Sequence, residues 1–414
     1  MVPAEGTAEG TSGRPAERTS GPTADEPAGL VLAPFRAVRY GRQDPHDLGL
    51  VTSPPYDVIN AAALETLRAS HPHNIVRLIL PRPGEEVAER LQEWLHDGVL
   101  VRDDDPGLYV YEYAGHGRRV RGLVGALGLR DFADRIVLPH EDVMPGPVAG
   151  RASLMRSTRS NLEPILLVYD GDGTASDAVD ATTDAPPLVT TLAPDGSEHT
   201  VWRIDEPATL RAIAADLAPR QALIADGHHR YAAYRQCQQT QPGDAWSYGL
   251  AMLVDQSRHP LQLGPIHRVA RGLALDTVAG TPATPGDVGW TAYGADGAGA
   301  HAALDAVTDG SAFLATDGRA WGILRGRLGE VETAALHDLL LPRWGVADDD
   351  VLYVHDASNA VSRAVDVGGT ALLLRAPDVS AVVAASSRGQ MLPRKTTSFG
   401  PKPRMGLLLR LLDD

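Results

Sequence analysis

The sequence predicts an α+β protein, of mixed α/β character, and two observations support this prediction. Short apolar runs typical of strands occur at residues 108–113, 119–129, 162–169 and 248–254. Helical periodicity or helix-start signals occur at residues 60–70, 85–97 and 207–217. The two kinds of element do not alternate strictly, so a mixed arrangement is favoured over a doubly wound parallel sheet.

The remaining segments follow from the same signals. We expect further strands near residue 30 and at residues 75–80, 200–204, 222–225, 352–355 and 371–374. Residues 171–198 are rich in turn formers, and the Gly, Ala, Thr and Asp content of residues 275–310 predicts a loop-rich insertion. The resulting divisions are a disordered tail (1–29), an N-terminal α+β part (30–170), a middle part (171–270) and a C-terminal α+β part (271–414).

Composition narrows the classes of function. The 414 residues carry a formal net charge of −15, which argues against a general nucleic-acid or membrane-surface role because both need basic faces. The single cysteine, Cys237, excludes an internal disulfide framework and is expected to be a packing residue. No run of 18 apolar residues occurs and the N-terminus lacks an apolar signal region. We therefore expect a cytoplasmic protein with a small-molecule partner, and composition leaves the oligomeric state open.

The most informative stretch is residues 224–234, which read Ile-Ala-Asp-Gly-His-His-Arg-Tyr-Ala-Ala-Tyr. An apolar run ends in Asp226, breaks at Gly227 and continues as a helix. Backbone N–H groups at a helix start attract anions, and His228, His229 and Arg230 add side-chain donors there. We interpret this stretch as a phosphate-binding turn with the acid Asp226 beside it. A purely structural turn is the alternative.

A second cluster lies in a proline-bounded loop that contains His140, Glu141 and Asp142. Glu141 is the candidate acid/base carboxylate, with His140 beside it. Arg156 and Arg159, on a short helix over residues 152–160, are candidate phosphate clamps. A solvated charged loop beside a basic helix face explains the pattern equally well.

Three smaller motifs are further candidates for anion binding or for structural turns. Tyr56 and Asp57 follow two prolines and offer a donor and an acceptor, although a turn at a strand end is favoured there. His267 and Arg268 follow a Gly-Pro-Ile run. The last motif places Lys395 and Lys402 in a turn-rich segment that suits phosphate or carboxylate binding. The sequence contains no P-loop and no Gly-x-Gly-x-x-Gly after a strand, so any ATP site binds the phosphates through another motif. It also contains no His-Glu-x-x-His zinc motif.

Taken in order, these motifs resemble the family known as domain of unknown function 1015. They are Pro-Phe-Arg-Ala at 34–37, Ser-Pro-Pro-Tyr-Asp-Val-Ile at 53–59, Leu-Pro-His-Glu-Asp-Val-Met-Pro-Gly-Pro at 138–147, Ile-Ala-Asp-Gly-His-His-Arg-Tyr at 224–231, Gly-Pro-Ile-His-Arg at 264–268, and Pro-Arg-Lys-Thr-Thr at 393–397 with Pro-Lys-Pro at 401–403. The resemblance spans about residues 30–410.

Within that pattern, Asp-Gly-His-His-Arg-Tyr-Ala-Ala at 226–233 is similar to the nucleotide-binding turn of the ParB and sulfiredoxin superfamily, which includes free-serine kinases. The resemblance implies a ParB/sulfiredoxin-like nucleotide-binding core with additional mixed β-sheet elements. It places Asp226, Gly227, His229 and Arg230 in the turn and requires a separate acid, for which Glu141 is the candidate. It also implies ATP or ADP as phosphoryl donor, with Mg²⁺.

Three functions are compatible with these observations. The first is a small-molecule kinase that phosphorylates a hydroxylated amino acid such as serine. The second is a non-catalytic nucleotide-binding switch protein. The third is a metal-dependent hydrolase or phosphatase built on His140, Glu141, Asp226, His228 and His229, and the divergence of adjacent histidines argues mildly against it.

Overall fold

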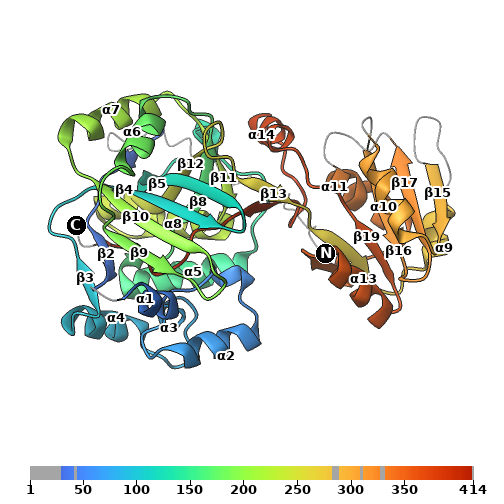
Figure 1. Cartoon of the computed structure of the whole chain (residues 1–414), viewed down its shortest axis with the longest axis horizontal. Coiled ribbons are helices and arrows are strands. Elements are labelled where there is room, and N and C mark those ends of the chain that lie inside the picture. Colours follow the sequence, from blue (N-terminus) through green and yellow to red (C-terminus); the bar gives the residue numbers. More distant parts are fainter. Residues whose placement is uncertain (1–28, 42–43, 282–288, 308–310, 327–331, 413–414) are drawn as a thin grey trace, which may run out of the picture.

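The computed structural model describes residues 29–41, 44–281, 289–307, 311–326 and 332–412, and it folds into two lobes (Figure 1). Apart from Gly29, the expected tail over residues 1–29 lies outside the described residues. Helices and sheets occur in both lobes, so the α+β prediction is confirmed. The large sheet of the first lobe is mixed, whereas the described strand pairs of the second-lobe sheet are all antiparallel.

The larger sheet forms the centre of the first lobe. Its strands, in spatial order, are β6 (Val137–Leu138), β11 (Ala222–Asp226), β8 (Ile165–Tyr169), β12 (Tyr248–Asp255), β5 (Arg118–Gly128), β4 (Leu108–Gly115), β10 (Glu198–Ile204) and β9 (Val189–Leu192), with β1 (Leu32–Ala33) added beside β5. β8 runs parallel to β12 and antiparallel to β11, which makes the sheet mixed. Its side chains are buried on both faces: Leu167 packs into one core, and Leu166 and Val168 pack into the other.

Four helices pack against one face of this sheet, namely α5 (Pro145–Thr158), α6 (Thr174–Thr182), α7 (Pro207–Leu217) and α8 (His228–Thr240). α1 (Pro45–Val51), α3 (Val76–Ile79) and α4 (Val87–His96) pack into a separate core with a smaller sheet, and α2 (Ala61–Ser70) contacts α1 and α3. Asn60 caps α2 by accepting a hydrogen bond from the Ala63 N–H, as the sequence predicts. A smaller sheet of β3 (Leu100–Arg102), β2 (Ala37–Tyr40), β21 (Leu409–Leu411) and β7 (Ser160–Asn161) returns the C-terminal strand to this lobe.

Two sequence-based assignments in this lobe are wrong. Within residues 75–80, Val76–Ile79 form the short helix α3 instead of a strand, and at its start the buried Asn74 side chain accepts a hydrogen bond from the Val76 N–H. A short apolar run does not distinguish a buried strand from a buried helix turn. The turn-rich segment 171–198 contains α6 and β9, and Ala175 and Val179 of α6 pack into the core.

The second lobe is built on a separate sheet with the order β15 (Gly289–Gly294), β17 (Trp321–Gly326), β16 (Ser311–Thr316), β19 (Thr370–Leu373), β14 (His267–Ala270) and β18 (Val351–Val354). Its described helices pack on both faces of the sheet. α9 (Leu275–Ala279), α11 (Glu332–Ala335), a π-helical turn (Leu336–Leu340) and α12 (Leu341–Arg343) lie on one face, and α10 (Gly297–Asp305) and α13 (Ala357–Asp366) lie on the other. The expected loop-rich insertion at 275–310 is therefore wrong where the chain is described. Ala300 and Leu304 bury one side of α10 against the sheet despite its glycine-rich composition.

The chain crosses between the lobes at two adjacent places. β13 (Gln262–Gly264) leaves the first lobe and pairs antiparallel with β20 (Ser398–Gly400), which returns to it (Figure 1). Before that return, α14 (Val379–Ser387) packs Val382 and Ala385 onto the sheet of the first lobe. This paired crossing sets the position of the pocket described below.

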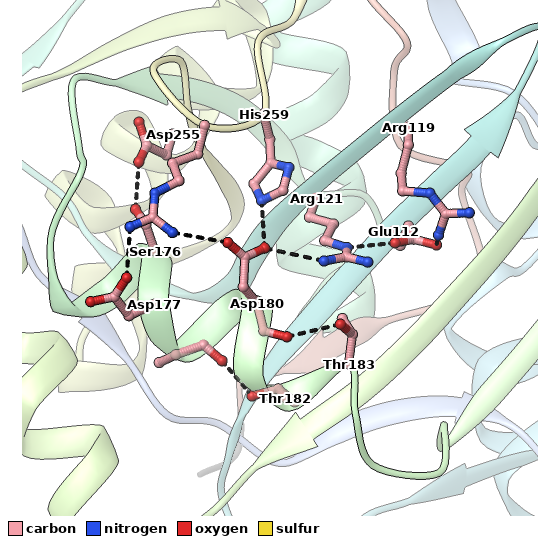
Figure 2. Close-up of polar contacts among 12 residues, drawn as sticks. Glu112, Arg119, Arg121, Ser176, Asp177, Asp180, Thr182, Thr183, Asp255 and His259 are labelled. Carbon is pink, nitrogen blue, oxygen red and sulfur yellow. Dashed lines mark hydrogen bonds and ion pairs between the residues drawn. The ribbon is translucent and has the colours of Figure 1, made fainter.

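A network of charged side chains anchors the first crossing to α6. Figure 2 shows the Asp180 carboxylate of α6 between Arg121 and His259, at 3.1 and 2.9 Å. Asp255 accepts hydrogen bonds from Ser176 of α6 and from Ser257. Because Asp255 ends β12 and His259 lies in the loop that leads into β13, the network attaches this loop to the first lobe.

The buried His199 is expected to make the free energy of unfolding depend on pH. Its ring contacts the Tyr111 hydroxyl at 2.7 Å and the Ser197 hydroxyl at 2.9 Å, and burial together with the nearby Arg404 lowers its pKa to about 4. A histidine in the unfolded chain titrates near pH 6.5. The stabilisation from neutral His199 is therefore complete above about pH 6.5 and is lost as the pH falls through about 4.

We expect this histidine to account for about 3 kcal/mol of the loss in the free energy of unfolding over that range. The free energy of unfolding, measured by denaturant titration at pH 7 and pH 4, should fall less in H199Q than in the wild type. The same substitution at the exposed His46 is the control. Equal losses in all three proteins would contradict the prediction.

Among the described residues, no helix combines the length and the apolar character that a membrane crossing requires.

Candidate functional site

The strand, glycine turn and helix predicted at residues 224–234 form the floor of the candidate site. β11 ends at Asp226, Gly227 has a φ of 99°, and α8 starts at His228. This left-handed conformation is one that glycine adopts without a steric penalty. The first backbone N–H groups of α8 have no acceptor within the helix, so the N-terminus of α8 offers donors to an anion.

We expect Gly227→Ala to disturb this turn. A Cβ at position 227 would lie 2.8 Å from Cγ2 of Ile165, and the residue would keep an unfavourable φ. The backbone strain alone costs about 1–3 kcal/mol, and the contact with Ile165 adds to it. Gly196 provides a matched control, because its φ is 82° and a Cβ there meets nothing within 4 Å. Thermal unfolding should show a larger loss for G227A than for G196A, and equal losses would contradict the close approach to Ile165.

A chain of alternating charges crosses the site above this turn. The Lys402 ammonium lies 3.0 Å from Oδ2 of Asp57 and also contacts Asp226, which in turn binds the guanidinium of Arg230. Burial alone would raise the pKa of Asp57, but Lys402 and Arg230 lower it overall. Burial would likewise lower the pKa of Lys402, but Asp226 and Asp57 raise it overall. Asp57, Lys402 and Arg230 are therefore charged near neutral pH.

This charge chain bears on the Mg²⁺ that the family resemblance implies. The Lys402 ammonium lies between the Asp57 and Asp226 carboxylates, in the position that a divalent cation bound by both would occupy. Among the described residues, no group of three or more His, Cys, Asp or Glu side chains is arranged to hold a metal ion. These residues do not fit a metal site formed by the protein alone, and no step below uses a metal.

The histidines join the two clusters that the sequence analysis treated separately. The His228 ring accepts a hydrogen bond from the His140 N–H at 3.4 Å, and the two rings meet edge to face at 4.5 Å. The His229 ring accepts from the Met144 N–H at 3.0 Å. Burial lowers the pKa of His140, His228 and His229. These rings therefore hold the loop at 140–144 against the start of α8, so the two segments meet in space.

Glu141 is held by the return segment of the chain. Its carboxylate accepts hydrogen bonds from the N–H groups of Lys395, Thr396 and Thr397 at 3.2, 3.0 and 3.2 Å. The Thr397 hydroxyl lies 3.3 Å from the same carboxylate and 2.7 Å from Nε2 of His140. Each of these contacts joins residues more than 250 positions apart in the chain.

These groups border a pocket of about 550 Å³ between the two lobes. The first lobe contributes Tyr56, Asp57, Glu141, Asp142, Asp226, Gly227, His228, His229 and Arg230, among others. The second lobe contributes Asp348, Asp349, Val351 and Tyr353, and the crossing segments contribute Ile266, Arg394, Lys395, Thr397, Ser398 and Lys402. Sequence segments from both ends of the chain thus meet around one cavity.

Four of the six expected clamps do not line this pocket. Arg156 lies beside Cys237, which is buried as predicted, and Arg159 ends α5 and donates to the Leu412 carbonyl at 3.1 Å. His267 and Arg268 are buried in β14 of the second lobe. The other two, Lys395 and Lys402, do line the pocket.

Several pocket residues received no role in the site from the sequence alone. Asp57 was a candidate for anion binding or for a turn, with the turn favoured, yet it faces Lys402 in the pocket. Arg394 adjoins Lys395 in the same motif, so its positive charge is the feature of the sequence that indicates anion binding at this position. Tyr353 and His355 follow an ordinary strand pattern, which gave no signal of a site.

The family model described as "Protein of unknown function (DUF1015)" matches residues 32–281. The chain belongs to this family. The match includes Asp57, Glu141 and the turn at Asp226–Gly227, whereas Lys395 and Lys402 lie beyond it. No curated protein matches the chain.

Several solved structures resemble parts of the chain. A free serine kinase in complex with AMP is 14% identical, with a TM-score of 0.37 over 69% of this chain and 91% of that one. A conserved hypothetical protein from Pyrococcus furiosus is 14% identical, with a TM-score of 0.37 over 70% of this chain and 96% of that one. SbnI with a C-terminal truncation, from Staphylococcus aureus, is 12% identical, with a TM-score of 0.39 over 70% and 89%.

Proposed function

We propose that this protein is a small-molecule kinase that transfers a phosphoryl group from ATP or ADP to a hydroxylated amino acid such as serine. One observation carries the proposal: the N-terminus of α8 opens into a pocket that is also lined by Arg394, Lys395 and Lys402. A helix N-terminus and several cations around one cavity suit the phosphates of a nucleotide. The volume of about 550 Å³ is within the range of small-molecule sites.

Phosphoryl transfer depends mainly on positioning and charge neutralisation, which this pocket supplies. In the proposed reaction the substrate hydroxyl oxygen attacks the terminal phosphorus of the donor. A new O–P bond forms, the bridging P–O bond breaks, and ADP or AMP leaves with the electron pair. The hydroxyl proton passes to a carboxylate of the pocket.

Asp57 is the carboxylate that we assign as proton acceptor. Its Oδ2 binds Lys402, while its Oδ1 has no hydrogen-bond partner among the described residues. Asp226 contacts two cations, and Glu141 accepts hydrogen bonds from three backbone N–H groups. Asp57 therefore has the oxygen that is most available to a substrate hydroxyl, and it takes the role that the sequence suggested for Glu141.

The test is incubation of the purified chain with ATP or ADP, Mg²⁺ and a pool of hydroxylated amino acids, followed by mass spectrometry. A phosphorylated amino acid that is absent from the reaction with D57N would support the kinase. No product from any nucleotide and amino-acid pair would contradict it.

A non-catalytic nucleotide-binding switch is the second candidate, and one observation favours it. The pocket has walls from both lobes, and the lobes are joined by the paired strands β13 and β20. A ligand that contacts both walls would change how the lobes are arranged. Saturable nucleotide binding without product, together with a ligand-dependent change in small-angle X-ray scattering, would favour this function.

A further inference from the structure

The contact between Glu141 and the segment at residues 395–397 has the form of an occupied anion site. Three consecutive backbone N–H groups converge on one carboxylate, at 3.0–3.2 Å. Lys395 has a φ of 58°, a left-handed conformation that helps successive N–H groups to point to one side. Concave groups of backbone N–H donors of this kind bind phosphate in many proteins.

The surroundings of this turn suit a ligand as well as they suit Glu141. The Thr397 side chain adds a hydroxyl donor, and Lys395 is an exposed cation without an ion-pair partner among the described residues. Glu141, Lys395 and Thr397 all line the 550 Å³ pocket. Glu141 also lines a second cavity of about 320 Å³, together with Phe132, Val143 and Met391, so its side chain has space to move into when displaced.

We propose that the N–H groups of Lys395, Thr396 and Thr397 form a phosphate-binding turn that the Glu141 carboxylate fills until a ligand phosphate displaces it. Glu141 is then an internal competitor, and ligand affinity is lower than the turn alone would provide. This inference rests on the proposed function only in placing a ligand phosphate in this pocket. It does not require that the phosphate be transferred.

The test measures binding of inorganic phosphate to the full chain by isothermal titration calorimetry at constant ionic strength. Glu141→Gln keeps the side-chain shape but removes the charge. The side chain that competes with phosphate for the three N–H groups then becomes neutral and binds them more weakly. We expect E141Q to bind phosphate roughly tenfold more tightly than the wild type. Adding Thr397→Val to E141Q should remove part of this gain, because the hydroxyl donor is lost.

Asp142→Asn is the matched control, because Asp142 is an exposed carboxylate that lines the same pocket and lies next to Glu141 in the chain. It changes the net charge by the same amount without vacating the turn. An equal gain in D142N and E141Q would assign the effect to charge alone and overturn the proposal. Unchanged or weaker phosphate binding in a folded E141Q would also overturn the proposal, because Glu141 would then serve only to hold the two segments together.

A second measurement uses the wild-type chain and does not depend on how the variants fold. With ¹⁵N-labelled threonine, saturable amide shifts of Thr396 and Thr397 during phosphate titration are expected, and their absence at saturation would overturn the proposal. Competition by ADP but not by phosphoserine would assign the phosphate to the nucleotide, and the reverse result would assign it to the phosphorylated product. Both results support the turn, and neither requires kinase activity.

Discussion

Asp57→Asn should lower kcat of the proposed kinase by about 10²–10⁴-fold, the usual effect of removing a general base. The amide cannot accept the hydroxyl proton, whereas it can still lie beside Lys402. We therefore expect the affinity for nucleotide to change much less than kcat. Steady-state kinetics with the amino acid identified by mass spectrometry, together with nucleotide titration, would separate the two effects.

Two variants make this prediction specific. D142N removes another carboxylate from the pocket, and E141Q neutralises the acid that the sequence alone favoured. We expect both to retain far more of kcat than D57N does. A loss of 10²-fold or more in E141Q, with only a few-fold loss in D57N, would return the role of base to Glu141. Circular dichroism of each variant checks that the comparison concerns folded protein.

Lys402→Met should lower the free energy of unfolding by about 3–5 kcal/mol, more than the other substitutions described above. Lys402 is 18% exposed and binds both Asp57 and Asp226. Its removal leaves two partly buried carboxylates without their shared cation. Lys395→Met makes the same chemical change on an exposed side chain of the same segment, and its effect should be small. Denaturant titration at pH 7 measures both.

The pH dependence of K402M provides a sharper test. In the wild type the lowered pKa of Asp57 contributes stability that is present above the pKa of an unfolded aspartate, near 4, and that is lost on further acidification. Without Lys402, burial is expected to raise the pKa of Asp57, which reverses the sign. K402M should therefore lose less stability than the wild type, or regain some, as the pH falls from 7 towards 4.5. If the free energy of unfolding of K402M and of the wild type changed in parallel with pH, the shared ion pair would be contradicted. K402R keeps the charge and should resemble the wild type.

Local signals in the sequence were sufficient for many elements. The apolar run of β11, the glycine after Asp226 and the polar start of α8 are each encoded by neighbouring residues, and each was predicted correctly. The errors occurred where local signals are ambiguous. The run at 75–80 is apolar enough for a strand or a helix. α10 contains two glycines, so its composition suggested a loop, whereas Ala300 and Leu304 pack into the core and fix it as a helix. The ParB/sulfiredoxin-like core stays a prediction.

The sequence alone determined that a glycine turn at Asp226–Gly227 starts a helix, and that two other charged motifs occur around Glu141 and Lys402. Only the tertiary structure decided which of these groups meet. Lys402 and Asp57 are 345 residues apart, and Glu141 and Thr397 are 256 apart. A backbone turn is set by the residues that form it, whereas an ion pair across such a separation depends on how the sheets and the two crossing segments pack. The same packing placed Lys402 beside Asp226 and left an oxygen of Asp57 available in the pocket.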